Sequence, residues 1–213
     1  MKSSEIIIQR KLSERQREEV AQILYDAFSA KLLHVWYHNK GKRETLALLK
    51  EGLGYEHGLY AVLKGQVLGF VGMDYGRGKR FLKIPFEKLT ETYGFGGGLF
   101  RHVMYMFEST FVDSRANSHQ TRIFPIAVSP QARGQGLGSI LLKAVDEHAQ
   151  QEDKRSVVLE VIDSNLRARK LYEKEGYVTT GYCYTAFFTK KAGFSGIHYM
   201  KKKLPMGLRS GIR

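Results

Sequence analysis

Residues 128–139 read VSPQARGQGLGS and lie between a stretch typical of a strand and one typical of a helix. Gly134, Gly136 and Gly138 occupy three of five consecutive positions. Glycine permits a positive φ and lets another group come close to the backbone. A turn that leads into a helix also aims unpaired backbone N–H groups and the positive end of the helix dipole at one point. The stretch therefore predicts a phosphate-binding turn, with Arg133 placed for an added charge-assisted contact.

The spacing of these glycines excludes two other phosphate-binding motifs. A Walker loop needs G-x-x-x-x-G-K-[ST], and no lysine follows a glycine at the required place. A dinucleotide-binding fingerprint needs G-x-G-x-x-G, whereas this turn has G-x-G-x-G. The turn must therefore hold its ligand in another way.

Strand-like and helix-like patterns alternate on both sides of the turn, which predicts an α/β fold around a sheet. Ser13 and Gln16 form a capping box, which predicts the start of a helix whose apolar residues share one face. Strands are expected at 5–10, 58–63, 67–75, 121–128, 157–162, 177–188 and 196–203, and further helices at 43–53, 136–150 and 165–175.

Residues 76–117 interrupt this alternation with a segment rich in glycine and aromatic residues. After the run Gly96-Gly97-Gly98, five apolar side chains fall on one helical face: Leu99, Phe100, Val103, Met104 and Phe107. The segment is expected to be an insertion with a helix of its own. It serves either as a lid over a substrate cavity or as a packing or dimerisation element.

Length and composition favour one folded domain over residues 1–213. At about 100–200 residues per domain, 213 residues make one compact unit, and 43% hydrophobic residues are ample for a core. A single cysteine excludes an intrachain disulfide and argues against a metal site. Since no stretch reaches the roughly 18 apolar residues of a membrane span, we expect a cytoplasmic protein with no membrane partner.

The net charge of +13 suits an anionic partner, which could be nucleic acid, acidic lipid or a phosphorylated small molecule. The cationic residues are mostly scattered, and the densest runs, 190–191 and 201–203, lie near the C-terminus, where solvated basic tails are common. This scattered distribution argues against nucleic acid as the partner.

Two motifs in this order resemble the cofactor segments of the GCN5-related N-acetyltransferase (GNAT) family. The first is Gln131-x-x-Gly134-x-Gly136 after a strand, and the second is the segment NLRARKLYEKEGY at 165–177. The resemblance covers residues 118–203, the expected cofactor-binding core. It implies the GNAT fold, a mixed central sheet of about six to seven strands flanked by helices. It also implies acetyl-coenzyme A (acetyl-CoA) as cosubstrate, no metal, and a possible homodimer.

The resemblance further implies where acetyl-CoA binds. The pantetheine arm would pair with the main chain of the strand that ends at Val128, and the pyrophosphate would lie on the turn. Pro125 is compatible with a bulge in this strand, or with an edge position. Asn165, also a natural helix cap, would contact the arm. The implied cofactor-binding residues are Ile126, Ala127, Val128, Gln131, Arg133, Gly134, Gln135, Gly136, Leu137, Gly138, Ser139 and Asn165.

By the same resemblance Tyr172 is the catalytic residue, a general acid for the leaving thiolate. The implied reaction is direct attack by a primary amine of a small molecule or peptide on the acetyl carbonyl, with the N–H of Val128 holding the oxyanion. Two alternatives stay open: a non-catalytic domain that binds or senses acyl-CoA, and a basic module that associates with nucleic acid.

The sequence departs from the family at the general base, because strand 121–128 carries no carboxylate. Four residues elsewhere are candidates, each also typical of a surface or capping position: Asp74, His119, Glu160 and Asp163. The aromatic stretch 33–38 forms either one wall of an acceptor pocket or a hydrophobic plug, and the later aromatics are expected to form another wall, which favours an apolar or aromatic amine. Those later aromatics are Tyr182, Tyr184, Phe187 and Phe188.

Overall fold

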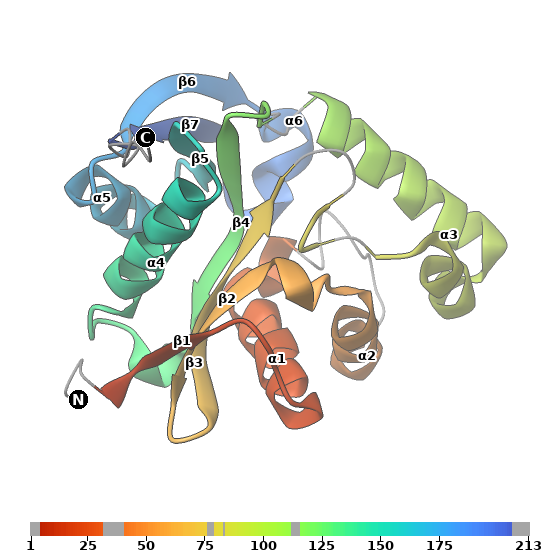
Figure 1. Ribbon diagram of the computed structural model, residues 1–213. Coiled ribbons are helices and arrows are strands. Elements are labelled where there is room, and N and C mark those ends of the chain that lie inside the picture. The colour runs from red at the N-terminus through yellow and green to blue at the C-terminus, as the bar shows by residue number, and fades with distance from the viewer. Residues whose placement is uncertain (1–4, 32–40, 76–78, 83, 112–115, 206–213) are drawn as a thin grey trace, which may run out of the picture.

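The computed structural model describes residues 5–31, 41–75, 79–82, 84–111 and 116–205. Its centre is a seven-stranded sheet in the order β1-β2-β3-β4-β5-β7-β6 (Figure 1). Neighbouring strands are antiparallel except β4 and β5, so the sheet is mixed, as expected. The strands are β1 (Ile7–Gln9), β2 (Gly58–Leu63), β3 (Gln66–Asp74), β4 (Gln120–Val128), β5 (Ser156–Ile162), β6 (Val178–Tyr184) and β7 (Gly196–Lys203).

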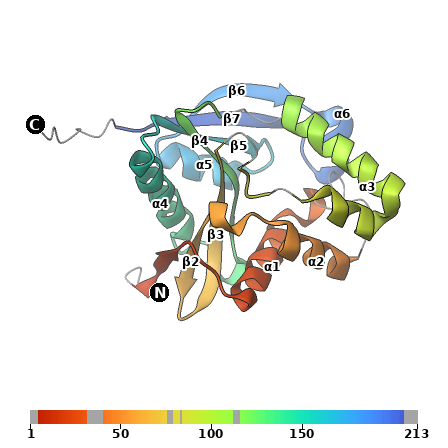
Figure 2. The same ribbon diagram turned by 45° about the vertical axis from the view of Figure 1, so that its right-hand side comes forward.

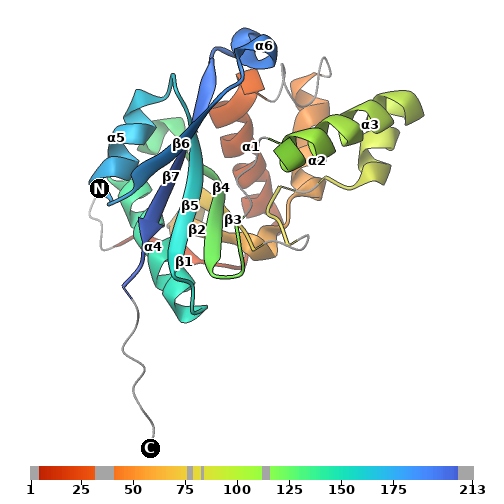
Figure 3. The same ribbon diagram turned by 90° about the horizontal axis from the view of Figure 1, so that it is seen from above.

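Helices cover both faces of this sheet. Seen from above, α4 and α5 lie on one face, and α1, α2 and α3 lie on the other (Figure 3). Each face has its own buried apolar cluster. The cluster on the first face includes Leu141 and Val145 of α4, and the cluster on the second includes Leu24 of α1 and Leu49 of α2. The helices are α1 (Glu14–Lys31), α2 (Lys42–Gly52), α3 (Phe86–Phe111), α4 (Leu137–Gln151), α5 (Leu166–Lys174) and α6 (Ala186–Thr189), with short 3-10 turns η3 (Tyr55–His57), η4 (Pro130–Ala132) and η5 (Lys190–Ala192).

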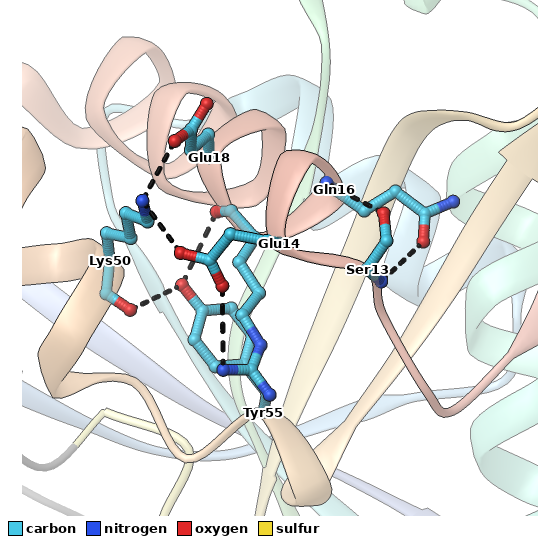
Figure 4. A network of polar contacts seen from close by, with 7 residues as sticks. Ser13, Glu14, Gln16, Glu18, Lys50 and Tyr55 are labelled. Carbon is cyan, nitrogen blue, oxygen red and sulfur yellow. Dashed lines mark hydrogen bonds and ion pairs between the residues drawn. The ribbon is translucent and has the colours of Figure 1, made fainter.

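The start of α1 confirms the predicted capping box. The backbone N–H of Ser13 donates to Gln16 Oε1 at 3.0 Å, and the backbone N–H of Gln16 donates to Ser13 Oγ at 3.3 Å (Figure 4). In the same region Lys50 lies 2.8 Å from carboxylate oxygens of both Glu14 and Glu18, which ties the end of α2 to the start of α1.

Strand β4 carries a bulge at the predicted place. Val71 on β3 pairs with Ile126, but Met73 pairs with Ile123, so β4 has one residue more than β3 between these pairs. The extra residue falls at the position of Pro125, which has no N–H to give to a ladder. β4 lies between β3 and β5, but its ladder with β5 ends at Ile123, so Pro125 lies both at the bulge and beside the unpaired edge of β4.

Helix α3 is longer than the sequence suggested. It begins at Phe86 rather than after the glycine run, and it is kinked at Gly94, where φ is +73°. The segment before the kink packs into the cluster under α1 and α2 through Leu89 and Tyr93. The helix stands beside α2 on the side away from α4 and α5 (Figure 2).

The expected strand at 177–188 ends early, at Tyr184. Thr185 and Thr189 are the reason, because the Thr189 hydroxyl donates to the Thr185 carbonyl at 2.9 Å and lies 3.0 Å from the Thr185 hydroxyl. These bonds close a helical turn, and residues 186–189 form α6. Among the helices that the structure describes, none is long and apolar enough to cross a membrane.

Candidate active site

Strands β4 and β5 separate in the middle of the sheet. Their parallel ladder runs from Gln120 and Ser156 to Ile123 and Leu159, and ends there. Beyond this point β4 stays paired with β3 only, so its other edge faces a gap between the two strands. The sheet therefore opens on the carboxyl side of the only parallel pair among its described strands, where α/β folds commonly bind ligands.

The register of β4 on β3 decides which main-chain groups face this gap. The N–H of Ser129 donates to the carbonyl of Leu68 at 2.8 Å, and Val128 is the next position along β4, opposite Gly69. Because antiparallel pairs alternate between hydrogen-bonded and non-hydrogen-bonded, Val128 and Ile126 turn their N–H and carbonyl groups away from β3. Both residues therefore turn main-chain groups toward the gap, and the Val128 carbonyl accepts a hydrogen bond from Arg133 Nε at 3.2 Å.

The glycine turn between β4 and α4 has the predicted backbone. Gly134 has φ of +81° and Gly136 has φ of +82°, so both lie in the left-handed region that favours glycine. The first N–H groups of α4, at Leu137, Gly138 and Ser139, have no partner within the helix and point out of its N-terminus. The turn thus has the form of an anion-binding site.

Two neighbouring cavities lie over the glycine turn and in the gap between β4 and β5. The first, here called the turn groove, has a volume of about 510 Å³ and lies over the glycine turn. The second, the splay cavity, has a volume of about 270 Å³ and lies in the gap between β4 and β5. Both are lined by Ala27, Phe28, Ile126, Asn165 and Ala168. These shared walls place the two cavities next to each other.

Ten of the twelve predicted cofactor-binding residues line the turn groove. They are Ile126, Ala127, Val128, Arg133, Gly134, Gly136, Leu137, Gly138, Ser139 and Asn165. The other two, Gln131 and Gln135, do not line either cavity. Gln131 lines a separate surface hollow beside α1, and Gln135 Nε2 donates back to the Gln131 carbonyl at 3.1 Å. The Gln135 side chain therefore bonds to the backbone of the turn itself.

Asn165 caps α5 and lines both cavities. Its Oδ1 accepts a hydrogen bond from the backbone N–H of Ala168 at 3.1 Å. Because the cap uses the oxygen, the Nδ2 group remains able to donate to a ligand. The structure thus confirms the predicted cap and leaves the predicted contact sterically open.

Tyr172 lies two turns after Asn165 and lines the splay cavity. Its side chain packs beside Tyr177, with ring centroids 5.9 Å apart, and the residue is only 6% exposed. Burial raises the pKa of the Tyr172 hydroxyl above its ordinary value, because the phenolate would be poorly solvated. The hydroxyl therefore stays protonated and can serve as a proton donor.

Several lining residues have no counterpart in the predicted set. Phe28 lines both cavities at a break in α1, where its φ of −128° and ψ of 19° are not helical. Phe194 closes the far wall of the splay cavity, and Arg167 and Lys174 line the turn groove. The one available signal was helical spacing on α5, which places residues 167, 171 and 174 on one face.

Of the four candidate bases, Glu160 lines the splay cavity. Its carboxylate is bound by the guanidinium of Arg122, which also reaches Asp74 at 2.9 Å. Asp74 is only 5% exposed, so the surface position, one of the two alternatives expected for it, is wrong. It also accepts the backbone N–H of Phe81 at 3.1 Å. Asp74 therefore has a structural role, since it binds both the Arg122 side chain and the backbone of Phe81.

The two remaining base candidates lie outside both cavities. His119 is exposed just before the first residue of β4, at the end opposite the gap. Asp163 accepts hydrogen bonds from the Tyr182 hydroxyl and the backbone N–H of Ser195, both at 3.2 Å. Asp163 therefore does not cap α5, a role that Asn165 has, but ties the end of β5 to β6 and to the segment before β7.

Only part of the predicted acceptor walls lies within the residues that the structure describes. Residues 33–38 and the side chain of Phe188 lie outside the described part of the chain. Tyr182, Tyr184 and Phe187 are 50%, 65% and 81% exposed, and none of them lines the two cavities. No described side chain of α3 lines them either, so the lid interpretation of the insertion stays a prediction.

Comparison with known proteins agrees with this geometry. A sequence model of the acetyltransferase (GNAT) family matches residues 17–177. The chain therefore belongs to the GNAT family, and family membership supports N-acetyltransferase activity in general. An N-acetyltransferase family 8 member 2 from Rattus norvegicus is 30% identical over 80 residues, which is 38% of this chain and 35% of that protein. The match thus spans about a third of that relative's length.

Solved structures of N-acetyltransferases share the fold. A putative phosphinothricin N-acetyltransferase superposes with a TM-score of 0.59 at 15% identity, covering 94% of this chain and 99% of that one. A ribosomal-protein alanine N-acetyltransferase from Escherichia coli superposes with a TM-score of 0.54 at 15% identity, covering 98% and 99%. At this identity the likeness shows the fold alone.

Proposed function

We propose that the chain transfers an acetyl group from acetyl-CoA to a primary amine of a small molecule or peptide. The observation that carries this proposal is that the turn groove and the splay cavity are neighbours with five lining residues in common. Along these two cavities lie an anion-binding turn, the edge of β4 at Ile126 and Val128 that β5 leaves unpaired, and the Tyr172 hydroxyl. Acetyl-CoA presents a diphosphate, an arm with amide groups and a thioester in the same order.

The residues of the splay cavity suit transfer from a thioester. The amine attacks the carbonyl carbon, a C–N bond forms, the C–S bond breaks, and the sulfur leaves as a thiolate. Tyr172 donates its hydroxyl proton toward that thiolate. Ile126 lines the splay cavity together with Tyr172, whereas Val128 lines only the turn groove. We therefore assign the oxyanion contact to the N–H of Ile126 in place of Val128.

The proton lost by the amine goes to Glu160 in this proposal, directly or through one water. Of the four candidates only Glu160 lines the splay cavity, and its carboxylate is held in one orientation by Arg122. An amine with an ordinary pKa near ~10 is mostly protonated at neutral pH, so such an acceptor is needed before attack.

The names of two structural neighbours leave the size of the acceptor open. By their names, one acts on phosphinothricin, a small molecule, and another on an alanine of a ribosomal protein. The single cysteine fits a reducing compartment, which supports a cytoplasmic location.

Release of free thiol from acetyl-CoA in the presence of a panel of primary amines tests the proposal. Tyr172→Phe should abolish most of this release, while Tyr184→Phe should not, since Tyr184 is exposed and lines neither cavity. Thiol release that is absent with every amine, or equal in the wild type and Tyr172→Phe, argues against the proposed chemistry.

A further inference from the structure

We infer that Arg167 of α5 binds the diphosphate of acetyl-CoA beside the glycine turn, together with the backbone N–H groups at the start of α4. The inference rests on the proposed function. It adds a side-chain ligand on α5 to the backbone N–H groups that α4 offers.

The two faces of α5 differ in what they line. Tyr172 lines the splay cavity, on the same side of the helix as Asn165. Arg167, Leu171 and Lys174 line the turn groove and not the splay cavity. Spacing of four and three residues places these three side chains in one row. One face of α5 therefore serves the splay cavity, and the other serves the turn groove.

The guanidinium of Arg167 lies close to the glycine turn. Its Nη2 lies 3.5 Å from the point where a Cβ on Gly134 would be. The neighbouring arginine of the helix behaves differently, since Arg169 Nε donates to Glu173 at 3.0 Å. Within the part of the chain that the structure describes, Arg167 has no ion-pair partner. Its charge is thus available to a ligand on the turn.

The charges around the turn groove favour a multiply charged anion. Three cationic side chains line it, Arg133, Arg167 and Lys174, and its described lining holds no carboxylate. The positive end of the α4 dipole points into the same space. Like charges brought together repel each other, so the free protein is destabilised locally, and a diphosphate relieves that repulsion.

The fork of Arg167 suits this anion better than an ammonium would. A planar guanidinium can donate two parallel N–H groups to phosphate oxygens, whereas lysine binds as a point charge. Arg167→Lys is therefore expected to recover only part of the affinity that Arg167→Ala loses.

Calorimetric titration of four proteins with acetyl-CoA and with its analogue that lacks the 3′-phosphate tests the assignment. The proteins are the wild type, Arg167→Ala, Arg167→Lys and the control Lys170→Ala. Lys170 is an exposed cation of the same helix that lines neither cavity. Arg167→Ala should raise the Kd for both ligands about tenfold to a hundredfold, and Lys170→Ala should leave it within about twofold.

The outcomes separate this inference from the proposed function. Absence of wild-type binding overturns both. Wild-type binding with an unchanged Kd in Arg167→Ala overturns the role of Arg167 alone. A loss seen only with the ligand that carries the 3′-phosphate assigns Arg167 to that group and contradicts the diphosphate. Equal thermal unfolding of all four proteins verifies that the variants are folded.

Discussion

The guanidinium of Arg122 binds both oxygens of the Glu160 carboxylate, with Nε 3.0 Å from Oε1 and Nη2 2.6 Å from Oε2. Its Nη1 reaches Asp74 at 2.9 Å. The three residues belong to β3, β4 and β5, just where β4 and β5 separate. A buried ionic network therefore fixes the orientation of the one candidate base that lines the splay cavity.

Arg122→Met should destabilise the fold strongly, because it leaves Asp74 and Glu160 buried without their cation. Breaking a buried pair from one side costs about 3–5 kcal/mol. The control Arg169→Met removes a more exposed pair with Glu173 and should cost about 1 kcal/mol or less. Urea unfolding measures both values. If Arg122→Met lowers the free energy of unfolding by as little as the control does, the ionic network contributes little to stability.

Glu160→Gln should slow turnover while leaving acetyl-CoA binding in place. Loss of a general base typically costs about 10²–10⁴ in rate, and the amide that replaces the carboxylate would keep the shape of the side chain. Steady-state kinetics gives kcat, and titration gives Kd. If kcat stays within about threefold of the wild type, the amine loses its proton elsewhere.

Tyr172→Phe should lower kcat without changing the direction of the pH profile. Burial raises the pKa of Tyr172, so the hydroxyl remains protonated throughout the neutral and mildly alkaline range. The wild-type rate should therefore rise with pH as the amine deprotonates, and show no fall up to about pH 9.5. A falling limb near pH 8 that disappears in Tyr172→Phe would contradict this assignment.

Gly136→Val should abolish acetyl-CoA binding, and Gly65→Val is its matched control. Both glycines have similar positive φ, +82° and +80°, and a Cβ on either would meet no protein atom within 4 Å. Each variant should thus lose about 1–2 kcal/mol of stability through backbone strain. Only Gly136 lines the turn groove, so only its variant should lose the ligand. Equal affinity in the two folded variants would place the diphosphate elsewhere.

His148 should make stability depend on pH. Burial, with a further contribution from the charge of Arg10, lowers its pKa below the ordinary value near 6.5, while Glu152 opposes this shift. The ring lies 2.5 Å from the Tyr75 hydroxyl and 3.4 Å from Arg10 Nη1. Since the folded state binds this proton less readily, stability present above pH 6.5 should fall as the pH drops below it.

Thermal unfolding from pH 7 to pH 5 checks this effect. The midpoint of the wild type should fall more steeply than that of His148→Gln, which cannot take up the proton in this range. Parallel curves for the two proteins would show that His148 is not the group responsible.

Local sequence patterns were sufficient to predict the turn and helices that position the candidate site. The glycine turn between β4 and α4, the cap at Asn165 and the position of Tyr172 two turns later all depend on residues close in sequence. Helical spacing and turn chemistry determine them directly. These features could therefore be predicted before any tertiary contact was known.

Features that depend on distant contacts could not be predicted this way. The burial of Asp74 requires Arg122 from another strand, 48 residues away. The place of Gln131 and Gln135 outside the groove depends on how the turn folds back on itself. The early start of α3 depends on Leu89 and Tyr93 packing under α2, where tertiary packing outweighs the glycines that suggested a later start.

Calorimetric titration of the wild type with acetyl-CoA tests the central claim most directly, when the amine acceptor is added afterwards and thiol release is followed in the same sample. The account predicts saturable binding with one site per chain, followed by release of one thiol for each amine acetylated. No binding at millimolar acetyl-CoA, in protein shown to be folded, would contradict it.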